Sequence, residues 1–125
     1  MSRTVIAAID DMFFVAKIRA TAEHLDITVR SVRNAETLLN VAKESVADLI
    51  IVDLHAEKLD PIAVARALKA DEQVKAIRLL GFFSHVRADL QKAAVAAGYD
   101  VVIPRSVFSR DLAEILEGKS GGVNS

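Results

Sequence analysis

Short apolar runs alternate with amphipathic segments along this chain, and this alternation restricts its fold more than any other feature. The run Ala47–Asp53 is almost entirely apolar at its centre and ends on the carboxylate of Asp53. Such a run predicts a strand buried on both faces, as in the middle of a parallel sheet. Four further runs predict the other strands: Thr4–Ile9, Ile27–Val32, Ala76–Phe83 and Val101–Ile103. The second of these carries Arg30, which is typical of an edge strand.

Between the strands, apolar residues recur every three or four positions, which is the period of one helix face. We therefore expect helices over Met12–Leu25, Asn34–Ser45, Pro61–Ala70, Arg87–Ala97 and Ser109–Glu117. Asp60 followed by Pro61 is a strong start signal, and Ser109 is the expected cap of the last helix. Gly98 and Gly118 are expected to end their helices.

Five strand-helix units in alternation indicate an α/β fold, with a parallel sheet covered by helices on both faces. The 125 residues, of which 52% are hydrophobic, are enough for one compact domain. We assign residues 1–118 to this domain. Residues 119–125 are small and polar and are expected to form a flexible C-terminal tail.

Composition excludes several classes of function. The formal net charge is −1, with basic residues dispersed among acidic ones, so direct binding of nucleic acid is not expected. The absence of cysteine excludes disulfides and thiolate metal sites. No apolar stretch approaches the roughly 20 residues that span a bilayer, and no signal peptide is recognisable, so we expect a cytoplasmic protein without membrane insertion. Glycine-rich phosphate loops are also absent, which argues against a nucleotide-binding enzyme.

Polar side chains follow four of the predicted strands. They are Asp10 and Asp11, Asp53, Ser84, and Arg105. Right-handed crossovers bring the carboxyl ends of parallel strands to one edge of the sheet, where ligands bind in open α/β folds. We therefore expect these residues to converge on one site. One of the paired carboxylates can cap the first helix while the other binds a metal ion.

In this order, the polar residues resemble the phosphorylation site of response regulator receiver domains. The resemblance covers about residues 2–117 and implies a flavodoxin-like (βα)5 sandwich with strand order 2-1-3-4-5. It also implies that Asp53 accepts a phosphoryl group to form an aspartyl phosphate. Mg²⁺ would be held by Asp10, Asp11, Asp53 and the main-chain carbonyl of His55. Domains of this kind signal and are not enzymes in the ordinary sense.

The resemblance further implies that Ser84 and Arg105 bind the phosphoryl group and act as a switch. A single-domain response regulator would receive this group from a sensor histidine kinase or a phosphotransfer protein. It would signal to a downstream effector protein through a conformational change at the surface of the fourth helix, fifth strand and fifth helix. Whether it forms a homodimer is left open.

Several positions depart from the family pattern. Arg105 stands in place of the usual lysine and is followed by Ser106 instead of proline. Because arginine and lysine are not equivalent, Arg105 either clamps the phosphoryl group or pairs permanently with Asp53. Val102 replaces the usual aromatic switch residue. These departures favour an alternative function, a phosphorylation-independent pseudo-receiver that serves as a protein-interaction module.

Two histidines are expected near the same edge of the sheet. His85 replaces a residue that is commonly small in the family, and His55 lies in a loop that lacks the usual glycine. We expect both to modulate access to Asp53. The alternative is a transition-metal site formed with Asp11 and Asp53, since imidazole is a good ligand for zinc or nickel.

Overall fold

The computed structural model describes residues 3–119 and contains a five-stranded parallel sheet in the order β2-β1-β3-β4-β5. The strands are β1 (Thr4–Ala8), β2 (Thr28–Val32), β3 (Leu49–Asp53), β4 (Arg78–Phe83) and β5 (Val101–Pro104). The helices are α1 (Met12–His24), α2 (Ala35–Ser45), α3 (Pro61–Ala70), α4 (Ala88–Ala97), α5 (Arg105–Arg110) and α6 (Leu112–Leu116). The expected fold class and strand order are confirmed. Of the expected tail, residues 120–125 lie outside the described part of the chain.

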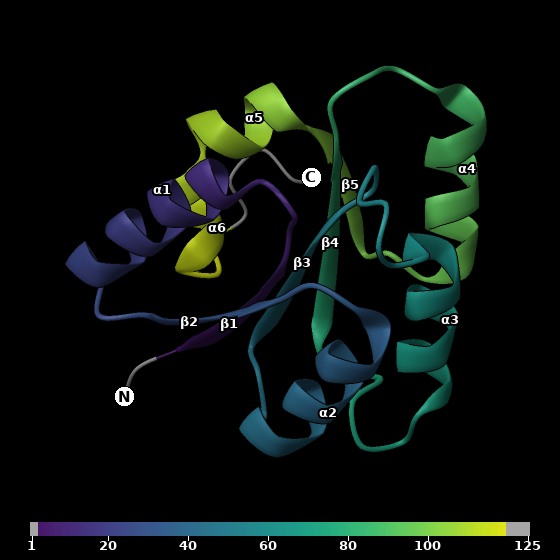
Figure 1. Cartoon of the computed structure of the whole chain (residues 1–125), viewed down its shortest axis with the longest axis horizontal. Coiled ribbons are helices and arrows are strands. Elements are labelled where there is room, and N and C mark those ends of the chain that lie inside the picture. Colours follow the sequence, from purple (N-terminus) through teal and green to yellow (C-terminus); the bar gives the residue numbers. More distant parts are fainter. Residues whose placement is uncertain (1–2, 120–125) are drawn as a thin grey trace.

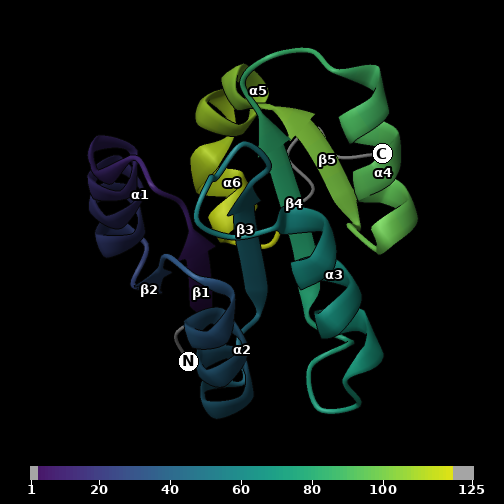
Figure 2. The ribbon, with the colours of Figure 1, turned by 45° about the vertical axis from the view of Figure 1, so that its right-hand side comes forward.

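The sheet separates two helical layers, and each layer covers its own hydrophobic core. Helices α2, α3 and α4 lie on one face, whereas α1, α5 and α6 lie on the other (Figures 1 and 2). Successive residues of β3 pack alternately in the two cores. Ile50 lies in the core beneath α2, α3 and α4, and Ile51 lies in the core beneath α1, α5 and α6. All positions from Leu49 to Val52 are buried, as predicted for a central strand.

Helix ends follow the signals in the sequence. Asp60 Oδ1 accepts the main-chain N–H of Ala63 at 3.2 Å and so caps α3. Gly98 ends α4 with φ of +120°, and Gly118 ends α6 with φ of +82°. Both values lie in the left-handed region, which glycine adopts without steric cost. Predicted and observed ends of the other elements differ by at most two residues, the usual uncertainty of such boundaries.

The last helical segment does not begin where the sequence predicted. Helix α5 begins at Arg105, directly after β5, and Ser109 lies inside it instead of capping a later helix. Phe108 is fully buried against the second core, so packing outweighs the preference of serine for caps. At Asp111 the backbone departs from helical geometry, with φ of −104° and ψ of +20°, and α6 follows.

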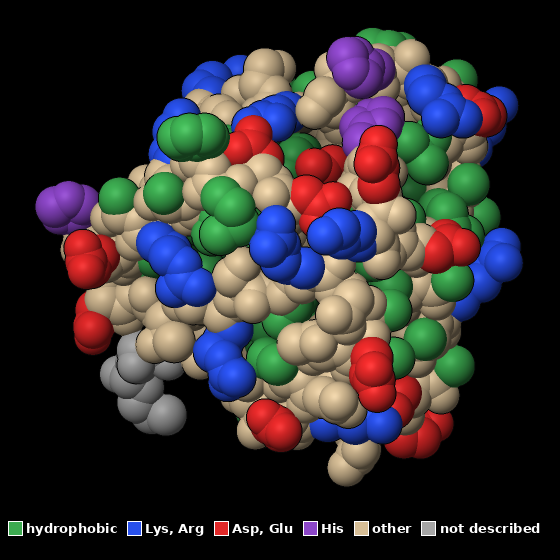
Figure 3. All heavy atoms as spheres, in the orientation of Figure 1, with side chains coloured by type: hydrophobic (Ala, Val, Ile, Leu, Met, Phe, Trp, Pro, Cys, Tyr) green, Lys and Arg blue, Asp and Glu red, His purple; other side chains and the backbone are tan. Residues whose placement is uncertain are grey.

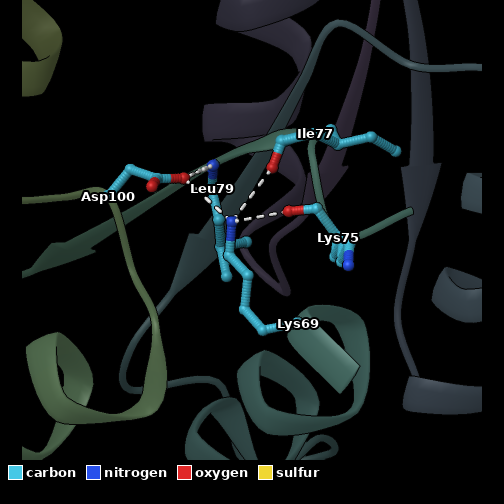
Figure 4. Close-up of polar contacts among 5 residues, drawn as sticks. All are labelled: Lys69, Lys75, Ile77, Leu79 and Asp100. Atoms are coloured by element: carbon cyan, nitrogen blue, oxygen red, sulfur yellow. Dashed lines mark hydrogen bonds and ion pairs between the residues drawn. The ribbon is translucent and has the colours of Figure 1, made fainter. Parts of the chain in front are cut away.

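Lys69 joins α3 to the amino edge of the sheet. Its ammonium group donates to the main-chain oxygens of Lys75 at 3.2 Å and Ile77 at 3.3 Å, and to the Asp100 carboxylate at 3.1 Å. The same Asp100 oxygen accepts the Leu79 N–H at 2.8 Å (Figure 4). One cation therefore links α3 to the segments that lead into β4 and β5.

Replacing Lys69 with methionine is expected to lower the free energy of unfolding by about 1–3 kcal/mol, because the Lys75 and Ile77 oxygens would lose this donor and Asp100 would lose its cation. Urea denaturation followed by circular dichroism measures the change. Lys17→Met is the matched control, since Lys17 is an exposed lysine of α1, and it should change the free energy by less than about 0.5 kcal/mol. Equal effects of the two substitutions would contradict a linking role for Lys69.

Candidate functional site

Asp53 ends the central strand β3 with a half-buried side chain. Its Oδ1 accepts the main-chain N–H of His55 at 2.9 Å. The loop after Asp53 is held to the sheet, since Leu54 N–H donates to the Phe82 carbonyl of β4 at 2.9 Å. No lysine or arginine pairs with Asp53 among residues 3–119. The carboxylate is thus fixed by the backbone and free of a cation in this part of the chain.

Asp10 follows β1, the strand next to β3. The register pairs Ala8 with Val52, which places Asp10 near the end of β3. Its Oδ2 accepts the N–H of Glu57 at 3.3 Å, whereas its Oδ1 is buried and has no hydrogen-bond partner among residues 3–119. A buried carboxylate oxygen without a partner is costly. A bound cation would remove that cost.

Asp11 both caps α1 and pairs with Arg105, a combination that the sequence did not predict. Its Oδ1 accepts the N–H groups of Phe13 at 3.0 Å and Phe14 at 3.2 Å, and so caps α1. Its Oδ2 accepts a hydrogen bond from Arg105 Nη2 at 3.1 Å. This bond from Arg105, followed by that from Phe14, holds the pKa of the Asp11 carboxyl below its usual value.

Arg105 therefore pairs with Asp11 and not with Asp53. Its guanidinium carbon also lies 4.0 Å from the centre of the Phe14 ring, in cation–π geometry. Phe14 belongs to an aromatic cluster, with ring centres 5.5 Å from Phe82 and 5.6 Å from Phe108. The sequence predicted the helix over Met12–Leu25 but did not identify Phe14 as the support of Arg105. Only the approach of α5 to α1 reveals that role.

Ser84 and the two histidines lie in the loops after β3 and β4. Ser84 and His85 are exposed and His55 is half-buried. The His85 N–H donates to His55 Nε2 at 3.4 Å, and the two ring centres are 5.6 Å apart. Acidic and histidine side chains gather at the top of Figure 3, where these loops lie in Figure 1. The histidines thus connect the Asp53 loop with the loop that carries Ser84.

The aromatic side chain near β5 has a structural role. Tyr99 is 4% exposed, and its hydroxyl donates to the Pro61 carbonyl at 2.8 Å. Burial, with the nearby charge of Asp60, raises the pKa of this phenol. A Cβ added at Gly81 would lie 3.0 Å from the ring, so glycine is what lets Tyr99 pack against β4. Val102, at the position of the expected aromatic switch, is half-buried.

The donor groups at this edge of the sheet suit some metal ions and not others. Among residues 3–119, no three His, Cys, Asp or Glu side chains are grouped so as to hold a metal. This finding gives no support to the transition-metal alternative with His55 and His85, and it equally gives none to a set in which Asp10, Asp11 and Asp53 all bind one ion. Mg²⁺ is commonly held by one or two carboxylates together with waters and phosphate oxygens. Asp53 and the unpartnered oxygen of Asp10 fit that requirement, whereas Asp11 is occupied by Arg105.

The geometry defines a parallel α/β domain with carboxylates at the carboxyl edge of its central strands. No protein-family model and no curated protein matches the sequence. The solved structures it resembles are response regulator receiver domains. The receiver domain of a signal transduction histidine kinase from Syntrophus aciditrophicus is 18% identical, with a TM-score of 0.82 over 99% of this chain and 95% of that one.

Two other solved structures resemble this chain with similar TM-scores. The receiver domain of a DNA-binding response regulator from Colwellia psychrerythraea is 14% identical, with a TM-score of 0.81 over 94% of this chain and 97% of that one. A phosphorylated cyanobacterial phytochrome response regulator is 20% identical, with a TM-score of 0.79 over 94% and 91% of the two chains. The chain therefore has the receiver-domain fold. No helix within residues 3–119 is both long enough and apolar enough to cross a bilayer.

Proposed function

We propose that this chain is a receiver domain of two-component signalling that is phosphorylated on Asp53 with Mg²⁺. The proposal rests on the position and the contacts of the Asp53 carboxylate. Its carboxylate lies at the end of the central strand, is oriented by the His55 N–H, and has no cationic partner among residues 3–119. A carboxylate oxygen held in this way is available as a nucleophile.

The phosphoryl donor would be a phosphohistidine of a sensor histidine kinase or of a phosphotransfer protein. An oxygen of Asp53 attacks phosphorus, the N–P bond breaks, and the imidazole leaves with that electron pair and takes up a proton. Bound Mg²⁺ would neutralise charge on the phosphoryl oxygens. Asp10 and Asp53 would supply its carboxylate ligands, with the main-chain carbonyl of His55, and Asp11 would join them once Arg105 has left it.

The signal would be read through Ser84. Its exposed hydroxyl follows β4 directly and can donate to a phosphoryl oxygen. Movement of Ser84 toward the phosphoryl group would shift the loop that leads into α4, so the surface of α4, β5 and α5 would change its affinity for an effector protein. The same surface could serve a homodimer.

Incubation with acetyl phosphate and Mg²⁺ tests the proposal. Intact-mass spectrometry should show the addition of one phosphoryl group, and hydroxylamine should remove it, because acyl phosphates are cleaved by this nucleophile. Omission of Mg²⁺ is the control and should suppress the adduct. Absence of an adduct at millimolar acetyl phosphate would rule the proposal out.

A second candidate is a pseudo-receiver that binds a protein partner without phosphorylation. The Arg105–Asp11 ion pair favours it, because that pair forms without a phosphoryl group. Val102, in place of an aromatic switch residue, also favours it. This candidate predicts that acetyl phosphate leaves the protein unmodified.

A further inference from the structure

We propose that Arg105 is an internal counter-ion that occupies Asp11 in the metal-free domain and must leave it before a divalent cation binds fully. This inference rests on the proposed function, since it concerns the metal that phosphorylation of Asp53 would require. It goes beyond that function by assigning to Arg105 a role in the resting state. In this state Arg105 limits the affinity of the site for metal.

Both carboxylate oxygens of Asp11 already accept hydrogen bonds. Oδ1 accepts two main-chain N–H groups at the start of α1, and these bonds maintain the helix cap. Oδ2 is thus the oxygen left to face a metal ion, and Arg105 Nη2 lies 3.1 Å from it. A Mg²⁺ ligand must approach to about 2.0–2.1 Å in near-octahedral geometry. A guanidinium group and a metal ion would compete for this oxygen.

Asp10 offers a different environment. Its buried Oδ1 has no hydrogen-bond partner among residues 3–119, so this oxygen can bind a cation without first losing a hydrogen bond. The two neighbouring carboxylates therefore differ, and a metal ion could first bind at Asp10. Full coordination by Asp11 would then require the guanidinium to leave, and repulsion between the two cations would favour its departure.

The contacts of Arg105 are suited to release. A single Nη2–Oδ2 contact joins the pair, and the Arg105 and Asp11 side chains are 34% and 40% exposed. Partly exposed single-contact ion pairs are weak because water competes with them. The Phe14 ring, 4.0 Å from the guanidinium carbon, adds a second modest attraction. After release, the guanidinium donors would be available to the phosphoryl group on Asp53.

Titration of the purified chain with Mg²⁺ by isothermal calorimetry, and with Mn²⁺ by electron paramagnetic resonance, tests the inference. Arg105→Gln removes the competing charge and should tighten binding of both metals by about tenfold, on the order expected for removing one nearby like charge. Arg110→Gln is the matched control. Arg110 lies in the same helix but pairs with Asp111, so this substitution should leave the affinity unchanged.

Arg105→Lys provides a second variant that keeps the charge but loses the planar fork. Its affinity should lie between those of the parent chain and Arg105→Gln. In the parent chain, the Arg105 side-chain NMR signals should move as Mg²⁺ is added, with the midpoint found by calorimetry. Signals that stay fixed while Mg²⁺ binds would overturn the inference, as would equal affinities of the parent chain and Arg105→Gln.

These outcomes separate the inference from the proposed function. Equal Mg²⁺ affinity with and without Arg105 would refute the counter-ion role and leave phosphorylation of Asp53 intact. Failure of every variant to bind Mg²⁺ or Mn²⁺ would refute the counter-ion role and would also remove the metal from the proposed function.

Discussion

Asp53→Asn is expected to abolish the response of the domain to beryllofluoride and Mg²⁺. Beryllofluoride forms its adduct on an aspartate oxygen and imitates a phosphoryl group. Asparagine keeps the shape of the side chain, and its amide oxygen can still accept the His55 N–H that now bonds Asp53 Oδ1 at 2.9 Å. The anionic oxygen that would bind beryllium is lost, so the variant should fold normally and show no adduct.

Two-dimensional NMR spectra of the amide groups provide the measurement. In the parent chain, beryllofluoride should shift the signals of His55, Ser84 and the first turn of α4, whereas Asp53→Asn should show no such shifts. Asp26→Asn is the control. Asp26 is exposed in the turn after α1 and has φ of +57°, which asparagine tolerates well. A full response of Asp53→Asn would place the adduct on another residue.

The helix caps and the sheet were accessible from the sequence because each depends on short segments. Asp60 followed by Pro61 predicted the start of α3, and the apolar centre of β3 predicted burial on both faces. The helix start predicted at Ser109 was wrong, because Phe108 is buried and the helix already begins at Arg105. Burial is a property of the assembled core, and a local cap signal does not contain it.

Local sequence signals also predicted the position of the polar site but not the contacts within it. Its carboxylates follow their strands, so the topology alone predicted the edge on which they lie. Which carboxylate would cap α1 was left open, and the structure assigns that role to Asp11. The partner of Arg105 was also uncertain, with the phosphoryl group and Asp53 as the two expectations. Its pairing with Asp11 depends on the approach of α5 to α1 and on the position of the Phe14 ring.

Phe14→Ala is expected to cost about 3–5 kcal/mol of unfolding free energy, the usual range for a buried phenylalanine. Phe14 is 4% exposed and makes edge-to-face contacts with Phe82 and Phe108, whose rings stack with centres 5.0 Å apart. Truncation would open a cavity between α1, β4 and α5. It would also remove the aromatic face on which the Arg105 guanidinium lies.

The adjacent residue provides the control. Phe13 is also a phenylalanine of α1 but is 91% exposed, so Phe13→Ala should change the unfolding free energy by less than about 0.5 kcal/mol. Urea denaturation of both variants measures the difference. A loss for Phe14→Ala as small as that for Phe13→Ala would contradict the packing role.

Phe14→Leu separates packing from cation–π support, because leucine fills part of the cavity but offers no aromatic face to Arg105. This variant should regain stability relative to Phe14→Ala, yet hold Arg105 less firmly on Asp11 and therefore bind Mg²⁺ more tightly than the parent chain.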